Sequence, residues 1–179
     1  MSACTVTSGC FGLFFLIIIS VMVRFERIAT IKNNNMIDLP PQALIERAVE
    51  PDLMSKCIAY ASKNFGVNSI VIRAIVNVEG GKIGTISKNS NGSFDLGVMQ
   101  INTIHLKDIK KKYPNVGWRE LTFKPCVNIF VGTSILKDRM SESSSYWNGV
   151  GSYHSKTPKY RNKYLIKVKA AVANLIAKR

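Results

Sequence analysis

Glu79 is the residue whose position along the chain best suits acid–base chemistry. It ends an apolar stretch, about one helical turn beyond Ile75, and Gly80 and Gly81 follow it directly. A carboxyl group that leans toward an apolar face loses water, and the negative end of a helix dipole lies beside it; both effects raise its pKa. An acid that keeps its proton near neutral pH can protonate a glycosidic oxygen. The alternative is a glutamate at the fringe of an exposed helix end.

Polar and aromatic side chains that suit a sugar lie in two later segments. Gln100 can donate and accept hydrogen bonds to N-acetyl or hydroxyl groups, and Tyr153 offers a ring face together with a phenol. Asp95 is the nearest carboxylate in the sequence, and hydrolytic glycosidases need a second carboxylate about 5 to 9.5 Å from the acid. A hydrolase that uses Glu79 and Asp95 therefore stays open. His105 is expected to be structural, and two separated histidines indicate no metal site.

The frame that must position these residues is predicted to be almost entirely helical, because apolar residues recur at helical spacing along most of the chain. Gly66 and Gly80 serve as C-terminal stops, Asn68 as a cap and Pro125 as a first-turn residue. Segment 82–94 is rich in Gly, Ser and Asn, which predicts a surface loop or a small irregular hairpin. The predicted helices cover residues 53–65, 69–79, 97–113, 126–140, 147–153 and 160–178.

The same spacing predicts which side chains of the longer helices face the core, and in 160–178 the predicted apolar face includes Tyr164. In 97–113 the inward residues are predicted to be Met99, Ile101, Ile104 and Leu106. In 126–140 they are predicted to be Val127, Phe130, Val131 and Ile135. The fold class that follows is a mainly α single domain.

Three motifs occur in the order found in one family of enzymes. The run Ala74–Glu79 with Gly80-Gly81, followed by Asn89–Asn102 (NSNGSFDLGVMQIN), resembles the catalytic region of the lytic transglycosylases related to goose-type lysozyme. Gly151–Ser155 matches the later Tyr-Asn or Tyr-His element, and the similarity runs from about Leu53 to Tyr164. It is greatest to the specialised enzymes that accompany secretion and conjugation machines. The family usually has Ser where this chain has Gly80, and Leu at position 98.

The resemblance implies a lysozyme-like fold and a mechanism with one catalytic acid/base, Glu79. Glu79 would protonate the oxygen between N-acetylmuramic acid and N-acetylglucosamine and then deprotonate the muramyl C6 hydroxyl, which leaves a 1,6-anhydromuramyl end. It implies peptidoglycan strands as substrate, a secretion, pilus or conjugation apparatus as partner, and no cofactor. The substrate-binding residues that it implies are Gly97, Met99, Gln100, Asn102, Tyr153 and His154.

The N-terminal part of the chain is predicted to be a membrane signal. Residues 2–23 contain no charged side chain, and 11–23 is apolar apart from one Gly and one Ser. Residues 1–30 are therefore interpreted as a cleaved signal peptide or a retained anchor, 31–43 as a linker and 44–179 as the folded domain. Arg24, Arg27 and Lys32 would place the domain in the cytoplasm by the positive-inside rule. Export to the periplasm or cell envelope is preferred, because peptidoglycan is found there.

The charge of the chain favours anionic partners without specifying one. Lys and Arg number 25 against 11 Asp and Glu, a formal net charge of +14, which attracts any polyanion. No arginine-rich recognition helix or zinc-like spacing accompanies the charge, so specific nucleic-acid binding is not expected. A basic module that binds peptidoglycan without cutting it remains an alternative function.

Cys57 and Cys126 are the cysteines of the predicted domain, since Cys4 and Cys10 lie in the leader. In an exported domain Cys57 and Cys126 are the natural disulfide pair. In a cytosolic domain they would be two buried thiols.

Overall fold

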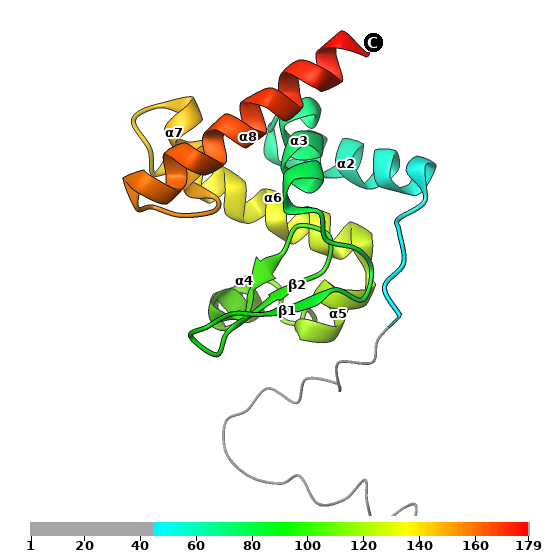
Figure 1. Ribbon diagram of the computed structural model, residues 1–179. Helices are drawn as coiled ribbons and strands as arrows, with labels where there is room; N and C mark the ends of the chain where they lie inside the picture. The colour runs from blue at the N-terminus through cyan, green and yellow to red at the C-terminus, as the bar shows by residue number, and fades with distance from the viewer. Residues whose placement is uncertain (1–44, 179) are drawn as a thin grey trace, which may run out of the picture. The chain divides into compact units, whose positions relative to one another are not determined.

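Helix α6 (Pro125–Ser141) is the central helix of the computed structural model, which describes residues 45–178 (Figure 1). Helices α2 (Pro51–Phe65), α5 (Trp118–Phe123) and α7 (Tyr146–Ser152) all pack against it. Because neighbours surround α6, its buried residues occupy more than the single predicted stripe: Val131 is buried as predicted, but Ile129, Leu136 and the polar Asn128 and Thr133 are buried as well. The described residues confirm the mainly α fold class.

The helices α2 and α3 (Ser69–Glu79) begin and end close to where the sequence predicts. Gly66 ends α2 with φ +63°, and its N–H donates to the carbonyl of Ser62 at 2.9 Å. Asn68 caps α3 by accepting the N–H of Ile70 at 2.9 Å. Gly80 ends α3 in the left-handed region, with φ +66°. The last helix, α8 (Pro158–Ala177), packs across α3.

The segment predicted as a loop or hairpin forms the first part of a small antiparallel sheet. Strand β1 (Ile86–Lys88) pairs with β2 (Phe94–Leu96), and β2 pairs with β3 (Ile101–Asn102). The register sets Lys88 opposite Phe94 and Asp95 opposite Asn102. The sheet thereby brings polar residues of the 89–102 segment to one side of the molecule.

The prediction of one helix over 97–113 was wrong. After β3 the chain forms a short 3₁₀ helix, η1 (Thr103–His105), and only then α4 (Leu106–Lys112). Gly97 and Gln100 have φ of +64° and +48°, a left-handed conformation that an α-helix cannot contain. Ile104, predicted to face inward, is 65% exposed. The apolar residues at helical spacing therefore belong to a turn, a strand and two helices in succession.

The remaining predictions concern helices α5, α7 and α8 and the N-terminal part of the chain. Helices α7 and α8 were predicted, whereas α5 was not. Residues 45–178 lie within one compact unit. Within them, no helix combines the length and hydropathy needed to cross a bilayer. The predicted membrane signal and linker lie outside the described residues.

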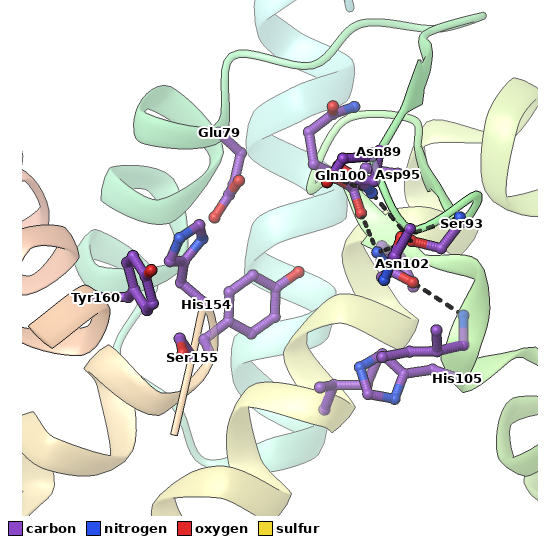
Figure 2. A pocket seen from close by; sticks show the side chains of 16 residues that line it. Glu79, Asn89, Ser93, Asp95, Gln100, Asn102, His105, His154, Ser155 and Tyr160 are labelled. Atoms are coloured by element: carbon purple, nitrogen blue, oxygen red, sulfur yellow. Dashed lines mark hydrogen bonds between the residues drawn. The ribbon is translucent and has the colours of Figure 1, made fainter. Parts of the chain in front are cut away.

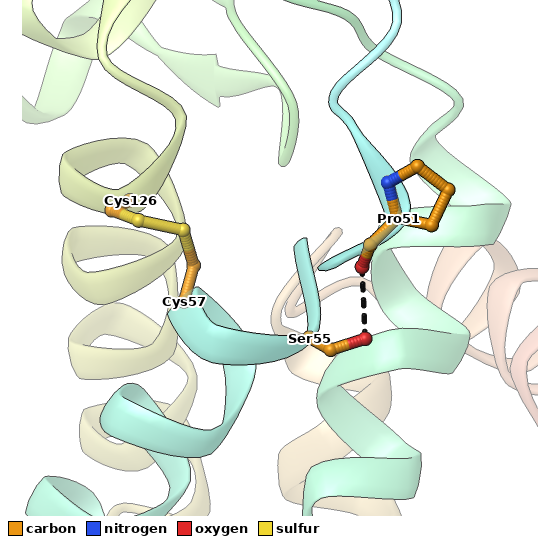
Figure 3. The surroundings of a disulfide bond; sticks show 4 residues. All are labelled: Pro51, Ser55, Cys57 and Cys126. Atoms are coloured by element: carbon orange, nitrogen blue, oxygen red, sulfur yellow. Dashed lines mark hydrogen bonds between the residues drawn. A yellow bond between two sulfur atoms is a disulfide. The ribbon is translucent and has the colours of Figure 1, made fainter. Parts of the chain in front are cut away.

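A disulfide joins α2 to the first turn of α6 (Figure 3). It links Cys57, which is 3% exposed, to Cys126, 69 positions further along the chain. Further along the two helices, Tyr60 and Phe65 of α2 contact the ring of Phe130 of α6. The bridge thus clamps the helix that precedes α3 to the central helix.

Replacing Cys57 and Cys126 together by alanine is expected to lower the free energy of unfolding by about 4 kcal/mol, the chain-entropy value for a loop of this length. Urea unfolding followed by circular dichroism measures the change. The unsubstituted chain in reductant should unfold like the variant. An unfolding midpoint that neither reductant nor the double substitution moves would contradict the prediction.

Candidate active site

A cleft of about 650 Å³ opens beside the C-terminal end of α3, between the small sheet and the connection from α7 to α8 (Figure 2). Its walls bring together residues that are far apart in the sequence. The predicted site residues that line it are Glu79, Asp95, Gln100, Asn102, Tyr153 and His154.

Glu79 stands at the end of α3 with its carboxyl group in the cleft (Figure 2). Burial raises its pKa to about 7; a hydrogen bond from Tyr164 opposes this shift, the charge of Asp95 adds to it, and Lys167 opposes it. Near neutral pH the group therefore exists in both forms. Such a carboxyl can give up a proton and then take one back.

Tyr164 holds the carboxyl group of Glu79 from helix α8. Its hydroxyl donates a hydrogen bond to Glu79 Oε1 at 2.6 Å, across 85 positions of sequence. The sequence placed Tyr164 only on the apolar face of the last helix and missed this role. The available signal was its hydroxyl, because a tyrosine on a buried face needs a hydrogen-bond partner.

His154 and Tyr153 lie side by side at the end of α7 and make different contacts. The His154 ring stacks on Tyr164, with ring centroids 4.8 Å apart and planes 10° from parallel. The Tyr153 hydroxyl donates to the carbonyl of Met99 at 2.8 Å, which ties this wall to the turn between β2 and β3. Burial first, and then the charges of Glu79 and Asp95, keep the pKa of Tyr153 well above its usual value. Tyr153 therefore acts as a neutral donor.

Gly97 and Met99, predicted as substrate-binding residues, are buried and are not among the residues that line the cleft; Met99 was also predicted to face the core. Met99 is fully buried and packs over Gly132, where a Cβ atom would overlap its sulfur. A Cβ atom at Gly97 would likewise collide with the Leu121 carbonyl and with Asn128. Both residues support the wall of the cleft by close packing.

Gln100 is held rigidly in the wall in spite of its left-handed backbone. Its Nε2 donates to the Gly97 carbonyl at 2.7 Å, and its Oε1 accepts from Ser87 Oγ at 2.8 Å. Gly81 faces this turn, and a Cβ atom there would overlap the Gly97 carbonyl oxygen. Glycine at position 81 lets the end of α3 approach the turn closely, which sets Glu79 beside the sheet.

Asn128 of α6 anchors the same turn, a role that was not predicted from the sequence. Its Nδ2 donates to the carbonyls of Leu96 and Leu121, each at 2.8 Å, and its Oδ1 accepts the N–H of Met99 at 2.7 Å. The residue is fully buried on α6. A buried amide with three backbone partners replaces the pairing that a regular strand or helix would supply here. An asparagine within the apolar first half of α6 was the signal in the sequence.

Asp95 occupies the sheet side of the cleft with both carboxylate oxygens engaged. Asn89 donates to Oδ2 at 3.0 Å and Asn102 to Oδ1 at 2.7 Å. The oxygen of the Asn102 amide also caps η1, by accepting the N–H of Ile104 at 3.0 Å. Asn102 therefore fixes the orientation of Asp95 while its own side chain is tied to the backbone.

His105, expected to be structural, also lines the cleft. Burial lowers its pKa, and the neighbouring charge of Arg139 acts in the same direction, so the ring is neutral at neutral pH. Within residues 45–178, no group of three or more His, Cys, Asp or Glu side chains is arranged to hold a metal ion.

Comparison with known proteins gives a match over most of the described residues. The family model described as "Transglycosylase SLT domain" matches residues 56–173. This range contains every residue of the cleft discussed above.

Individual relatives align with a little more than half of this chain. Invasion protein IagB of Salmonella typhimurium is 38% identical over 107 residues, which are 59% of this chain and 66% of that protein. A peptidoglycan-binding-like protein of Escherichia coli O157:H7 is 36% identical over 107 residues, 56% of this chain and 64% of its own length. Protein IpgF of Shigella flexneri is 29% identical over 114 residues, 62% and 72% of the two chains. The chain thus spans just under two thirds of the Salmonella protein.

Proposed function

The chain belongs to the transglycosylase SLT domain family, and from this premise we propose that it cleaves the β-1,4 bond between N-acetylmuramic acid and N-acetylglucosamine in peptidoglycan, leaving a 1,6-anhydromuramyl end. The observation that carries the proposal is the Glu79 carboxyl, which has a pKa of about 7 and faces a cleft lined mostly by polar residues. The neutral amides and hydroxyls along the cleft suit sugar hydroxyl and N-acetyl groups.

The proposed reaction uses Glu79 twice. Protonated Glu79 gives its proton to the bridging oxygen as the bond from this oxygen to C1 of the muramyl ring breaks. The resulting carboxylate removes the proton of the muramyl C6 hydroxyl, whose oxygen bonds to C1, so Glu79 ends protonated and no water is consumed. In the intermediate state the hydrogen bond from Tyr164 stabilises the carboxylate.

Mass analysis of the muropeptides that the intact chain releases from purified murein tests the proposal. Anhydromuramyl products, lighter by one water than hydrolysis products, are the expected result. Bound murein without any released fragment would indicate a non-catalytic binding module instead, the function that the name of the Escherichia coli relative suggests for that protein.

Asp95 favours the second candidate, a hydrolase with two carboxylates, because it lies in the same cleft as Glu79. Its two oxygens are occupied by Asn89 and Asn102, however, which favours a positioning role. Asp95→Asn is therefore expected to slow cleavage by less than about tenfold, whereas loss of a required nucleophile costs about 10³-fold or more. Products that carry an added water, and that Asp95→Asn suppresses, would favour hydrolysis.

Tyr164→Phe is expected to shift the pH dependence of cleavage. The Tyr164 hydrogen bond lowers the pKa of Glu79, so its loss raises that pKa further above 7. Since the first step needs protonated Glu79, the fall in kcat/KM with rising pH should move to higher pH. Rates measured between pH 5 and pH 9 on soluble glycan strands test this, and an unmoved alkaline limb would contradict it.

We also propose that the protein is exported and that it acts together with a larger envelope-spanning apparatus. The disulfide between Cys57 and Cys126 supports an oxidising compartment outside the cytoplasm. The apolar run at 11–23 supports passage to, or attachment at, a membrane. Local opening of the wall for a secretion, pilus or conjugation apparatus is supported by the resemblance to the specialised transglycosylases.

A further inference from the structure

A second hollow of about 170 Å³ adjoins the cleft, and His105 and Ile135 line both spaces. We call this second space the side hollow. Helices α4 and α6 and the segments that follow them form its walls. Figure 2 places His105 on the side of the cleft opposite Tyr160 of α8, so the side hollow lies on the side of the cleft away from α8. A substituent that projects sideways from a bound strand could enter it.

The two spaces differ in charge. Among the described residues, those that line the main cleft include the carboxylic acids Glu79 and Asp95 and no Lys or Arg. The side hollow has charged groups of both signs, namely Asp108, Lys112, Asp138, Arg139 and Glu142. Neutral sugar rings gain little binding energy from a lining of charged groups. It suits a ligand that carries both carboxylate and ammonium groups.

Arg139 can turn to a ligand carboxylate without leaving a charge unpaired. Its side chain is 21% exposed, and its Nη1 lies 3.2 Å from Glu142 Oε2. Glu142 has a second cation, because Lys156 Nζ lies 2.8 Å from the same oxygen. The guanidinium can therefore exchange Glu142 for a carboxylate in the hollow and bind it through two parallel N–H groups.

The acidic residues of the side hollow are held loosely. Asp138 lies 3.4 Å from Lys112 Nζ and Asp108 lies 3.3 Å from Lys111 Nζ, both as exposed pairs. Such pairs contribute little to stability and exchange easily. Lys112 also donates to Ser134 at 2.8 Å, so it keeps a partner if Asp138 turns to an ammonium group.

We propose that the side hollow binds the peptide stem of a muramyl residue, with a carboxylate of the stem on Arg139 and an ammonium group on Asp108 and Asp138. The stem leaves the sugar strand at the lactyl group of the muramyl ring, and a hollow that adjoins a glycan cleft gives such a side branch a place to bind. This inference rests on the proposed function. It specifies the substrate as glycan that still carries its peptides.

Binding to two ligands by the intact chain carrying Glu79→Gln, which prevents turnover, tests the proposal. The ligands are soluble glycan strands with their stem peptides and the same strands stripped by an amidase. Isothermal titration calorimetry should show about tenfold tighter binding of the peptide-bearing strands, a difference of about 1.4 kcal/mol. Arg139→Gln should remove most of this preference and leave the affinity for stripped strands unchanged, which also shows that the fold is intact.

Lys137→Gln is the matched control, since it removes one positive charge from an exposed position of α6 outside both cavities. It should retain the preference, and Asp138→Asn should reduce it. Equal affinity for the two strands, or a preference that survives Arg139→Gln, would overturn the stem site while leaving the proposed function intact. Failure to bind either strand would overturn both.

Discussion

Glu79→Gln should reduce the release of anhydromuropeptides by about 10³-fold or more, since the amide can neither donate the proton to the leaving oxygen nor accept one from the C6 hydroxyl. The substitution replaces the carboxyl group whose Oε1 accepts a hydrogen bond from the Tyr164 hydroxyl at 2.6 Å. Digestion of purified murein, followed by mass spectrometry of the soluble fraction, measures the effect. Circular dichroism should show the same helix content in both proteins.

Glu50→Gln is the matched control for this substitution, because Glu50 is exposed before α2 and makes no side-chain cap hydrogen bond. It should cleave murein like the unsubstituted chain. Full activity of Glu79→Gln would remove Glu79 from the mechanism and with it the proposed reaction.

The same substitution also separates catalysis from stability. Because the folded chain holds the pKa of Glu79 at about 7, above its ordinary value of 4.5, the stability from this group is fully present below pH 4.5 and is lost as the pH rises through 7. Glutamine carries no such penalty. Relative to the unsubstituted chain, Glu79→Gln should therefore gain stability between pH 5 and pH 8, a change that urea unfolding at the two pH values will detect. An inactive variant that is the more stable protein at pH 8 is the combination expected of a residue kept for function.

Asn128→Ala should lower the free energy of unfolding by about 3 kcal/mol or more, because two buried carbonyls and one buried N–H lose their partner. It should also impair cleavage at temperatures where the protein is still folded. The Met99 carbonyl in the same turn accepts the hydroxyl of Tyr153, so a loosened turn releases one wall of the cleft. Urea unfolding and murein digestion measure the two effects.

Asn174→Ala serves as the control, since Asn174 is exposed on α8. Its effect on stability should stay within about 0.5 kcal/mol. If Asn128→Ala were equally mild, the turn would have to be held by the sheet alone, and the role of Asn128 described above would be wrong.

The helices that were predicted correctly have ends set by a few neighbouring residues. Gly66, Asn68 and Gly80 act within one turn of the helices that they end or cap, so their effect can be read from sequence order. The failed helix over 97–113 shows the opposite case. Its apolar spacing was helical, but Gln100 is held in a left-handed conformation by contacts with residues of other segments.

The sequence by itself determined a mainly helical domain, the position of Glu79 at a helix end and the order of the motifs that place the chain in its family. Only the tertiary structure decided that Tyr164 holds the acid, that Ile104 is exposed and that Asn128 supports the turn. The physical reason is distance along the chain. Caps and periodicity depend on residues within about four positions, whereas a hydrogen bond such as that from Tyr164 to Glu79 joins groups 85 positions apart and exists only once α3 and α8 have packed together.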